Sequence, residues 1–411
     1  MWNLLGLLIS FVLIVSLVKI GKRFGLSMLL AAMVLTAFSL EHMSISEVFS
    51  VFRAAVVDLD TIGFAIGVLF IGILANSMKE TGEIEGIIGN LRSIMPRQGI
   101  LASIPAVFGL LPVPGGALMS APMVDEEGEH MKISKATRAF FNLWFRHVGF
   151  LVFPLAPPLL LLAGEAEVGL HWLILIQVPI FLLSVLVGIF LLWGEVRKNN
   201  QFKEKEANLP EAEASPLLGD FSPIIVSVVL FLLFSYLTPL SFYLSLVVSL
   251  PVGIAVSFSV KKVSEKSVYQ VLKEGISLDL PLAVLGIMVF REVVLSSGLR
   301  DTLADIFLGS FLPLPVLILL ISFLLGFSMG HNLGAVGVSY AVLASVISGN
   351  LPLIALVYVS SFFGYLISPI HLCVVVSYEY FDPNLGDFYK LYLLPTFVVL
   401  FISTVFFAVL G

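Results

Sequence analysis

Three ionisable side chains stand inside long apolar segments, where they could bind an ion. Arg146 and His147 occupy the segment 139–163, and His371 occupies the segment 352–376. An ionisable group inside a membrane costs from about 2.5 to more than 10 kcal/mol, so each is a functional candidate. The arginine fork suits a carboxylate or phosphate, and histidine changes charge near neutral pH. We interpret Arg146 as a substrate anchor; the alternatives are snorkelling to the interface or a structural bond to a carbonyl.

Two further apolar stretches are interrupted by glycine and proline, which exposes backbone groups. The stretch 97–127 breaks at Pro112-Val-Pro114-Gly115-Gly116, and the stretch 313–349 breaks at Gly330-His331-Asn332-Leu333-Gly334. A broken helix frees N–H groups that favour anions and C=O groups that favour cations. The predicted substrate-binding residues are therefore Pro114, Gly115, Gly116, Arg146, His147, His331, Asn332, Gly334 and His371.

A coupling ion would need its own ligands or a titrating group. The candidates are His147, Glu292, His331 and His371. Histidines favour protons slightly, although backbone carbonyls can bind Na⁺ without any acidic residue. His331 could bind an anion when protonated or cap the broken helix when neutral, and His371 could instead be a satisfied core histidine.

Other charged residues are predicted to be structural. Arg291 and Glu292 are neighbours on a helix and therefore cannot face each other, which favours a wider charge network. Asp60 and Asp279 are predicted helix N-caps. Glu165 and Glu167 are predicted to be solvated in a short outer loop.

The composition defines the class of protein. The 411 residues are 59% hydrophobic and 12% charged, and the mean hydropathy is +1.06, whereas a soluble chain carries about 25% charged residues. This excludes a soluble enzyme, a disordered tail and a nucleic-acid binder. The single cysteine, Cys373, is taken to exclude both a disulfide framework and any cysteine-ligated zinc site. No Walker loop or common hydrolase motif occurs, so we expect no enzyme activity, no metal and no cofactor other than coupling Na⁺ or H⁺.

The apolar segments predict an all-α polytopic membrane protein, since a helix needs about 20 apolar residues to span a bilayer. The predicted spans are 2–18, 24–42, 60–78, 139–163, 168–193, 220–239, 241–260, 280–297, 352–376 and 390–410. The broken stretches 97–127 and 313–349 are predicted re-entrant hairpins; the alternative is two ordinary spans joined by a short surface turn. The first span carries its basic residues after it and is predicted to be retained.

The two halves of the chain match each other at an offset near 217. Adding 216 carries Gly82 onto Gly298, and adding 217 carries Gly109 onto Gly326. We therefore predict a first repeat 1–195 with its hairpin 97–127, a cytoplasmic linker 196–219 and a second repeat 220–411 with its hairpin 313–349. Five spans per repeat is an odd number, so the second repeat is expected to be inverted.

Basic residues give the orientation, because cytoplasmic loops collect Lys and Arg. Only Arg53 and Arg300 fall on the outer side and Arg146 and Arg291 within spans, which leaves 18 of the 22 basic residues on the cytoplasmic side. Both termini are therefore predicted outside, in a multi-pass protein of the inner (cytoplasmic) membrane. The segments 45–57 and 264–276 are predicted interfacial amphipathic helices, or else frayed span ends.

This arrangement resembles the ion transporter superfamily, which includes gluconate permeases, citrate and dicarboxylate carriers and TRAP large subunits. The segments Leu111-Pro-Val-Pro-Gly-Gly-Ala117, Met329-Gly-His-Asn-Leu-Gly334 and Ser368-Pro-Ile-His-Leu-Cys373 resemble a ten-span branch of unknown function. The resemblance implies a homodimer in which the hairpin-bearing helices move as an elevator against a scaffold. The Ser-Asn-Thr tips of the sodium–dicarboxylate branch are missing, so its sodium sites do not carry over.

Inverted repeats with broken helices are typical of secondary transporters with a midplane site. We therefore predict a secondary active transporter of a small organic anion, a carboxylate or sugar acid, coupled to H⁺ or Na⁺. Its other partner is membrane lipid. The alternatives are a passive channel, a non-transporting sensor or scaffold, and an intramembrane hydrolase using Ser368 beside His371.

Overall fold

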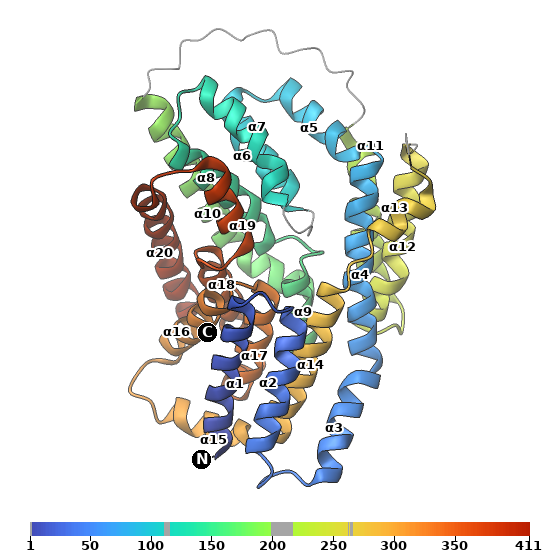
Figure 1. Cartoon of the computed structure of the whole chain (residues 1–411), viewed down its shortest axis with the longest axis vertical. Coiled ribbons are helices and arrows are strands. Elements are labelled where there is room, and N and C mark those ends of the chain that lie inside the picture. Colours follow the sequence, from blue (N-terminus) through green and yellow to red (C-terminus); the bar gives the residue numbers. More distant parts are fainter. Residues whose placement is uncertain (1, 111–115, 199–216, 262, 264–265) are drawn as a thin grey trace.

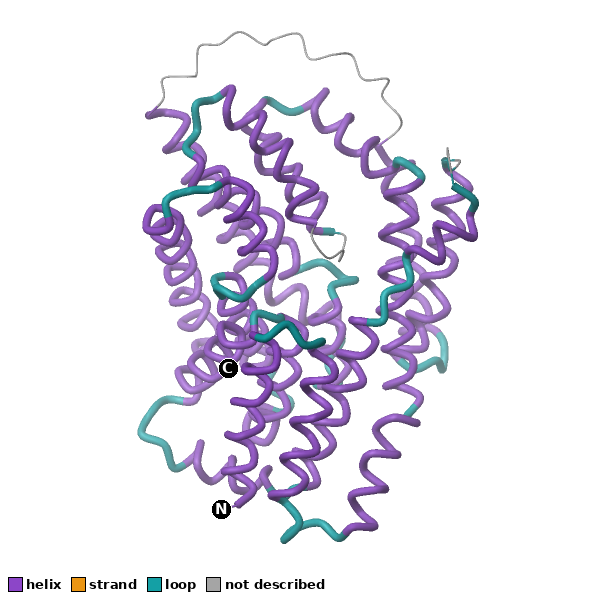
Figure 2. The backbone as a smooth tube through the Cα atoms, in the orientation of Figure 1, coloured by secondary structure: helices purple, strands orange, loops and turns teal. Residues whose placement is uncertain are grey.

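The protein is built from α-helices (Figures 1 and 2). The computed structural model describes residues 2–110, 116–198, 217–261, 263 and 266–411, and these contain no strand. Two predicted site residues, Pro114 and Gly115, lie outside the described residues. So do most of the predicted linker 196–219 and part of the predicted 264–276 helix.

The described residues before the predicted linker form ten α-helices and one 3₁₀ turn. They are α1 (Trp2–Lys19), α2 (Phe24–Phe38), α3 (Ile45–Val57), α4 (Leu59–Glu80), α5 (Glu83–Ile94), α6 (Arg97–Gly109), α7 (Gly116–His130), α8 (Lys135–Val148), η1 (Gly149–Leu151), α9 (Pro157–Glu165) and α10 (Leu170–Lys198).

The described residues after it form ten more α-helices. They are α11 (Leu217–Leu237), α12 (Phe242–Val260), α13 (Val268–Glu274), α14 (Asp279–Ser296), α15 (Leu299–Leu308), α16 (Leu314–Met329), α17 (Asn332–Ile347), α18 (Leu351–Leu366), α19 (Leu372–Phe381) and α20 (Leu385–Leu410).

The amphipathic helix predicted over 45–57 is confirmed as α3. Ser44 begins it with a capping box: its side chain accepts from the backbone N–H of Glu47, and the Glu47 carboxylate accepts from the backbone N–H of Ser44 at 2.7 Å. The apolar face remains open, with Phe49 74% and Ile45 72% exposed. An apolar face of this kind fits the membrane interface.

Six helices of the described residues are long and apolar enough to cross a membrane: α1, α4, α10, α11, α12 and α20. The pair α14 and α15 would make a seventh span, bent by 77°. The remaining predicted spans are short or broken. Helix α2 ends at Phe38 and has 15 residues, and the predicted spans 139–163 and 352–376 are each divided into two helices.

Proline explains the divided segments. The 3₁₀ turn and Pro154 separate α8 from α9, which begins with Pro157 and Pro158, and Ser368-Pro369 lie in the gap between α18 and α19. Proline lacks the N–H that would continue the helix ladder. Both breaks therefore interrupt the helical hydrogen-bond ladder inside the protein.

The helices form two groups, which we name by their members. The panel consists of α1–α4 and α11–α14, and the hairpin bundle consists of α6–α10 and α16–α20. In the panel, α4 packs against α12 and α2 packs against α14. In the bundle, α6 packs on α7 and α8, and α16 packs on α17 and α18. Figure 1 shows α4 beside α11 and α12 at the right of the view, and the bundle helices α6, α7 and α8 at the upper left.

Residues that the offset near 217 pairs between the two halves of the chain occupy similar local structures. Gly82 and Gly298 precede α5 and α15 with positive φ values of 77° and 71°, which favour glycine. Gly109 packs against the carbonyl of Arg146 on α8, and Gly326 packs against the carbonyl of Ser361 on α18. A side chain at either glycine would collide with that carbonyl, so each hairpin depends on glycine to approach the following helix.

Candidate functional site

Arg146 lies at the centre of the candidate site, near the C-terminal end of the buried helix α8. The residue is 3% exposed. Its Nη1 donates to the carbonyl oxygen of Phe108 at 2.7 Å, at the end of α6, where the helix C-terminus carries partial negative charge. Its Nε has no hydrogen-bond partner among the described residues. The first hairpin therefore orients the guanidinium group but leaves its Nε–H donor without a partner.

The charge of Arg146 has no acidic partner among the described residues. Arg138, two turns earlier on α8, pairs with Asp125 at 2.5 Å and with Glu129 at 3.3 Å, whereas no carboxylate of the described chain lies within 4.0 Å of Arg146. Arginine stays charged in proteins, and a buried charge without a partner is costly. An anion that enters the site would compensate this charge.

Gly116, the first residue of α7, lies directly against the guanidinium group. A Cβ on Gly116 would lie 2.6 Å from Nη1 of Arg146 and closer still to Nη2. The next layer is fixed by Asn142, which donates from Nδ2 to the carbonyl of Ala117 at 3.0 Å and to Ser377 Oγ at 3.2 Å. These bonds hold α7 and α19 against α8.

The two predicted histidines His147 and His371 lie next to each other, with ring centroids 4.9 Å apart. Nδ1 of His147 lies 2.7 Å from the carbonyl of Leu143 and can donate to it. His371 is 2% exposed, and neither of its ring nitrogens makes a hydrogen bond of normal geometry in the described chain. The ring of Tyr365 lies 3.9 Å from that of His371. His371 therefore offers unused polar atoms beside Arg146.

Cys373 joins this group, which sequence reasoning missed. One ligand atom each of His147, His371 and Cys373 lie within 4.8 Å of one another, and such nitrogen and sulfur donors suit Zn²⁺. The sequence-based exclusion of a cysteine-ligated metal rested on the cysteine count and overlooked this grouping. The charge of Arg146 acts on Cys373 and would repel a cation. The electrostatics therefore favour an anion here.

The second hairpin brings its break to the same region. Gly330 has φ 57° between α16 and α17, and a Cβ there would lie 3.0 Å from the backbone nitrogen of His371. His331 caps α17, since its Nδ1 accepts from the N–H of Gly334 at 3.2 Å. This bond needs an unprotonated Nδ1, so the geometry matches the neutral capping role. The ring of His331 also stacks on Phe24 of α2, at 4.2 Å between centroids.

Asn332 and Gly334 differ in their surroundings. Asn332 is 6% exposed, and neither atom of its amide makes a hydrogen bond of normal geometry in the described part of the chain. The neighbouring Tyr358 donates instead to the carbonyl of Phe150 at 2.7 Å. Gly334 faces the ring of Phe24 and not the arginine. Asn332 therefore has free donors and acceptors, whereas Gly334 allows a panel helix to approach.

Ser368 does not form a nucleophile–base pair with His371. Its hydroxyl donates to the carbonyl of Phe327 at 2.6 Å and accepts from the N–H of Ile370 at 3.4 Å. These bonds hold the break before α19 against α16. The geometry gives a positioning role to Ser368.

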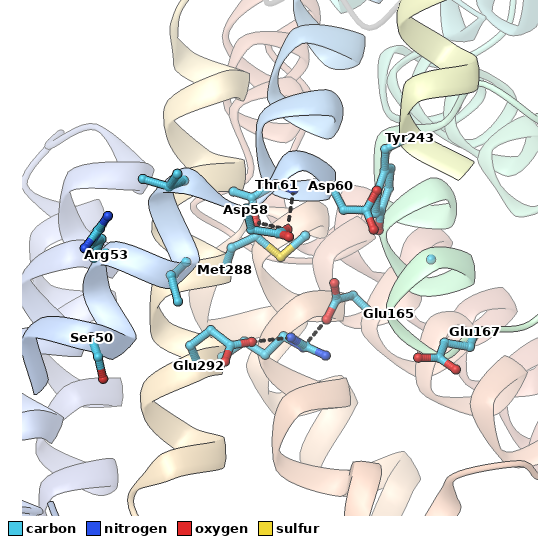
Figure 3. A pocket seen from close by; sticks show the side chains of 15 residues that line it. Ser50, Arg53, Asp58, Asp60, Thr61, Glu165, Glu167, Tyr243, Met288 and Glu292 are labelled. Carbon is cyan, nitrogen blue, oxygen red and sulfur yellow. Dashed lines mark hydrogen bonds and ion pairs between the residues drawn. The ribbon is translucent and has the colours of Figure 1, made fainter. Parts of the chain in front are cut away.

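A second charged cluster lines a pocket of about 720 Å³ between the panel and the bundle (Figure 3). Arg291 of α14 pairs through Nε with Glu165 at the end of α9, and through Nη1 with Glu292 at 2.5 Å. The predicted charge network at Arg291 is therefore present. Two other predictions were wrong: Arg291 and Glu292 do pair with each other, because the long arginine side chain reaches back, and Glu165 has a side chain only 10% exposed.

The predicted caps were also wrong in detail. Asp58 begins α4, since its carboxylate accepts from the N–H of Thr61 at 2.8 Å, while Asp60 lies in the first turn. The N-cap of α14 is Leu278, and Asp279 pairs with Arg23 at 3.4 Å. A difference of one or two residues in the start of a helix moves the cap to another side chain.

Together these features define a helical, membrane-embedded protein with a buried polar site where broken helices meet. The chain belongs to the family described as "Protein of unknown function (DUF401)", whose model matches residues 3–410. No curated protein matches the sequence.

Proposed function

We propose that the protein is a secondary active transporter of a small organic anion, such as a carboxylate or sugar acid. The observation that carries the proposal is Arg146, which is buried among breaks in helices and has no acidic partner in the described chain. A structural arginine would be expected to have a carboxylate, as Arg138 does. A site that must bind and release an anion keeps its positive charge available.

The remaining groups of the site suit a carboxylate or hydroxyl acid. Arg146 supplies charge, the amide of Asn332 can donate and accept, and His371 adds a ring nitrogen. The start of α7 at Gly116 adds the positive end of a helix dipole close to the guanidinium group. These groups come from both predicted hairpin regions and both divided spans, which is the usual construction of a midplane transport site.

The transport movement follows from the predicted repeats. We propose two inverted repeats, 1–195 and 220–411, in which the hairpin bundle moves as an elevator against the panel. Recurring helix pairs support the duplication: α4 with α12 corresponds to α2 with α14, and α7 with α19 corresponds to α9 with α17. The glycines Gly82 and Gly298, with matching backbone angles, support it further.

We propose H⁺ or Na⁺ as the coupling ion. Two of the candidate ligands, His147 and His371, lie beside Arg146. Glu292 lies in the separate pocket. The capping bond that His331 accepts opposes protonation of its Nδ1. The apolar outer faces, for example Phe190 at 69% and Phe401 at 70% exposure, suit contact with lipid. A homodimer in the inner membrane with both termini outside completes the proposal.

The direct test is uptake by proteoliposomes of labelled succinate, citrate and gluconate under an imposed proton or sodium gradient. We expect uptake of at least one acid, lost on Arg146→Gln and retained on Gly149→Ala, a nearby position at which a Cβ would meet no other atom within 4 Å. Uptake that does not depend on the sodium gradient and is lost when the pH gradient is abolished would assign H⁺ as the coupling ion. Absence of uptake of all three acids under both gradients would overturn the proposal.

A further inference from the structure

The ion pair between Glu165 and Arg291 joins the two groups of helices. Glu165 is the last residue of α9 in the hairpin bundle, and Arg291 belongs to α14 in the panel. The same guanidinium group also holds Glu292, its neighbour on α14, at 2.5 Å. In Figure 3, dashed lines connect Glu292 and Glu165 through this group. Arg291 thus has one partner that would move with the bundle and one that would stay with the panel.

The pocket gives water and protons a path to this ion pair. Its walls come from α3, α4, α12 and α14 of the panel and from α9 with the loop that follows it. All of these segments reach the pocket at the end that the basic-residue pattern predicts to face outside. The carboxylate of Glu165 is nine-tenths covered, while Asp58 and Arg53 at the wall are exposed. Glu165 therefore lies at the inner boundary of a space that opens outward.

Several other titratable groups face Glu165. The charge of Asp58, the N-cap of α4, acts on Glu165, and the charge of Glu165 acts on Tyr243 of α12 and Tyr340 of α17, while Asp60 of α4 acts on Tyr243. Glu167 and Arg53 complete the pocket wall. On α10 and α18, which also pack against α9, His171 bonds to Tyr236 and Tyr358 bonds to the carbonyl of Phe150. Acidic groups therefore outnumber basic ones around the pair.

This environment disfavours the ionised form of the Glu165 carboxylate. The residue follows the predicted span 139–163, and burial raises its pKa to about 7, against the opposing effect of Arg291. Glu292 and Asp58 raise the pKa further. A carboxylate in such surroundings changes its protonation state within the physiological range.

We infer that Glu165 is the proton-binding group that couples H⁺ to transport, and that its ion pair with Arg291 locks α9 to α14 until it is protonated. The inference rests on the proposed transport function. A proton from pocket water binds a Glu165 carboxylate oxygen and gives a neutral carboxylic acid. Arg291 keeps its charge and its bond to Glu292. The bundle is then free of the panel at this point and carries one proton with the anion; deprotonation on the other side restores the ion pair after return.

The first test measures the lock without any substrate. Hydrogen–deuterium exchange of the C-terminal peptide of α9, corrected for intrinsic exchange, should rise as pH falls from 8 and level off below about pH 7, over a series that extends to pH 5.5. Once α9 leaves Arg291, Glu165 loses the charge that lowers its pKa, so the released form binds the proton more tightly than the paired form, and the rise is at most about tenfold per pH unit above the pKa of the paired form. Glu165→Gln should exchange fast at both pH values. Glu167→Gln, which changes another acid of the same pocket that has no ion pair with Arg291, should behave as the wild type does. Glu165→Asp keeps a titrating group and should retain a pH response.

The second test measures coupling in proteoliposomes with labelled citrate, succinate and gluconate. Glu165→Gln should exchange the transported acid across the membrane but fail to accumulate it under a proton gradient, while Glu167→Gln accumulates it. Accumulation by Glu165→Gln at the wild-type level would overturn the inference. So would pH-independent exchange of α9 in the wild type, whatever the uptake. Absence of uptake by the wild type would instead overturn the proposed transport function, and the exchange experiment would still decide whether the lock exists.

Discussion

Gly116 lies so close to Arg146 that even a methyl group on its Cα would displace the guanidinium group. The contact joins the first residue of α7 to the end of α8, and Arg146 in turn donates to Phe108 at the end of α6. Three segments of the first predicted repeat therefore fix one side chain. A substitution at Gly116 can therefore shift the guanidinium group of Arg146 while the charge itself is retained.

Replacing Gly116 with alanine should disturb the anion site and leave the fold intact. The added Cβ forces Arg146 to move, and overpacking of this kind costs about 1–3 kcal/mol. Citrate, succinate or gluconate should then raise the Tm of the purified protein less than in the wild type. Gly149→Ala adds the same methyl group where no atom lies within 4 Å, and it should respond as the wild type does. Equal ligand responses in both variants would contradict the assignment.

Replacing Arg146 with glutamine should separate binding from stability. The variant loses the bond to Phe108 and also loses a buried charge, so the ligand-free protein should keep its stability to within about 1 kcal/mol. Anion binding should be abolished, and Arg146→Lys should weaken it about 10- to 100-fold, since bonds to charged groups contribute about 1.5–3 kcal/mol.

Arg138→Gln on the same helix is the matched control. It leaves Asp125 without the partner held at 2.5 Å and should lower the Tm while preserving the ligand response. A large loss of stability in Arg146→Gln together with an unchanged ligand response would show that Arg146 is structural.

His331 should contribute to stability as a helix cap. Its Nδ1 accepts from the N–H of Gly334, and loss of an N-cap costs about 1 kcal/mol. His331→Ala and His331→Asn both remove the stacking on Phe24, but asparagine can still cap. The alanine variant should therefore unfold at a lower temperature than the asparagine variant. Identical Tm values would exclude the capping role.

Glu83 should make stability depend on pH. It lies in α5, outside the candidate spans, and burial raises its pKa from 4.5 to about 7, although Ser257 and Thr81 donate hydrogen bonds to it. Between pH 4.5 and 7 the folded protein binds a proton that the unfolded chain does not, so the stability contribution falls as pH rises through this window. Tm measured from pH 5 to 8 should decline in the wild type and less in Glu83→Gln. The exposed Glu85 on the same helix, changed to glutamine, should leave the wild-type slope in place.

Local patterns predicted much of this fold from the sequence. The amphipathic period gave α3 with its observed ends, and the glycine at position 330 marked the break between α16 and α17. Arg146, His147 and His371 were predicted separately, and they lie together in the structure. Each depends on a signal that is local to its segment: period, helix breaker, or charge within an apolar run.

Partners distant in sequence could not be predicted in this way. Glu165 was expected to be solvated because nothing near it in the chain shows that Arg291 lies beside it. Cys373 was overlooked because its place next to His147 depends on how α19 packs against α8. The charge of Arg291 within an apolar segment was the available signal, since such a charge favours an acidic partner beside it.

In the panel, helices of the first half of the chain pack against helices of the second half, which has a consequence for how the protein is synthesised. Helix α4 packs against α12 and helix α2 against α14, so each half of the chain supplies the neighbour that the other half needs. During translation α2 and α4 enter the membrane before either partner has been made. Until the second half is made, α2 and α4 of the nascent chain contact lipid or insertion factors in place of their partners. The panel is therefore completed only after insertion of the second half, and a chain truncated before α12 cannot complete it.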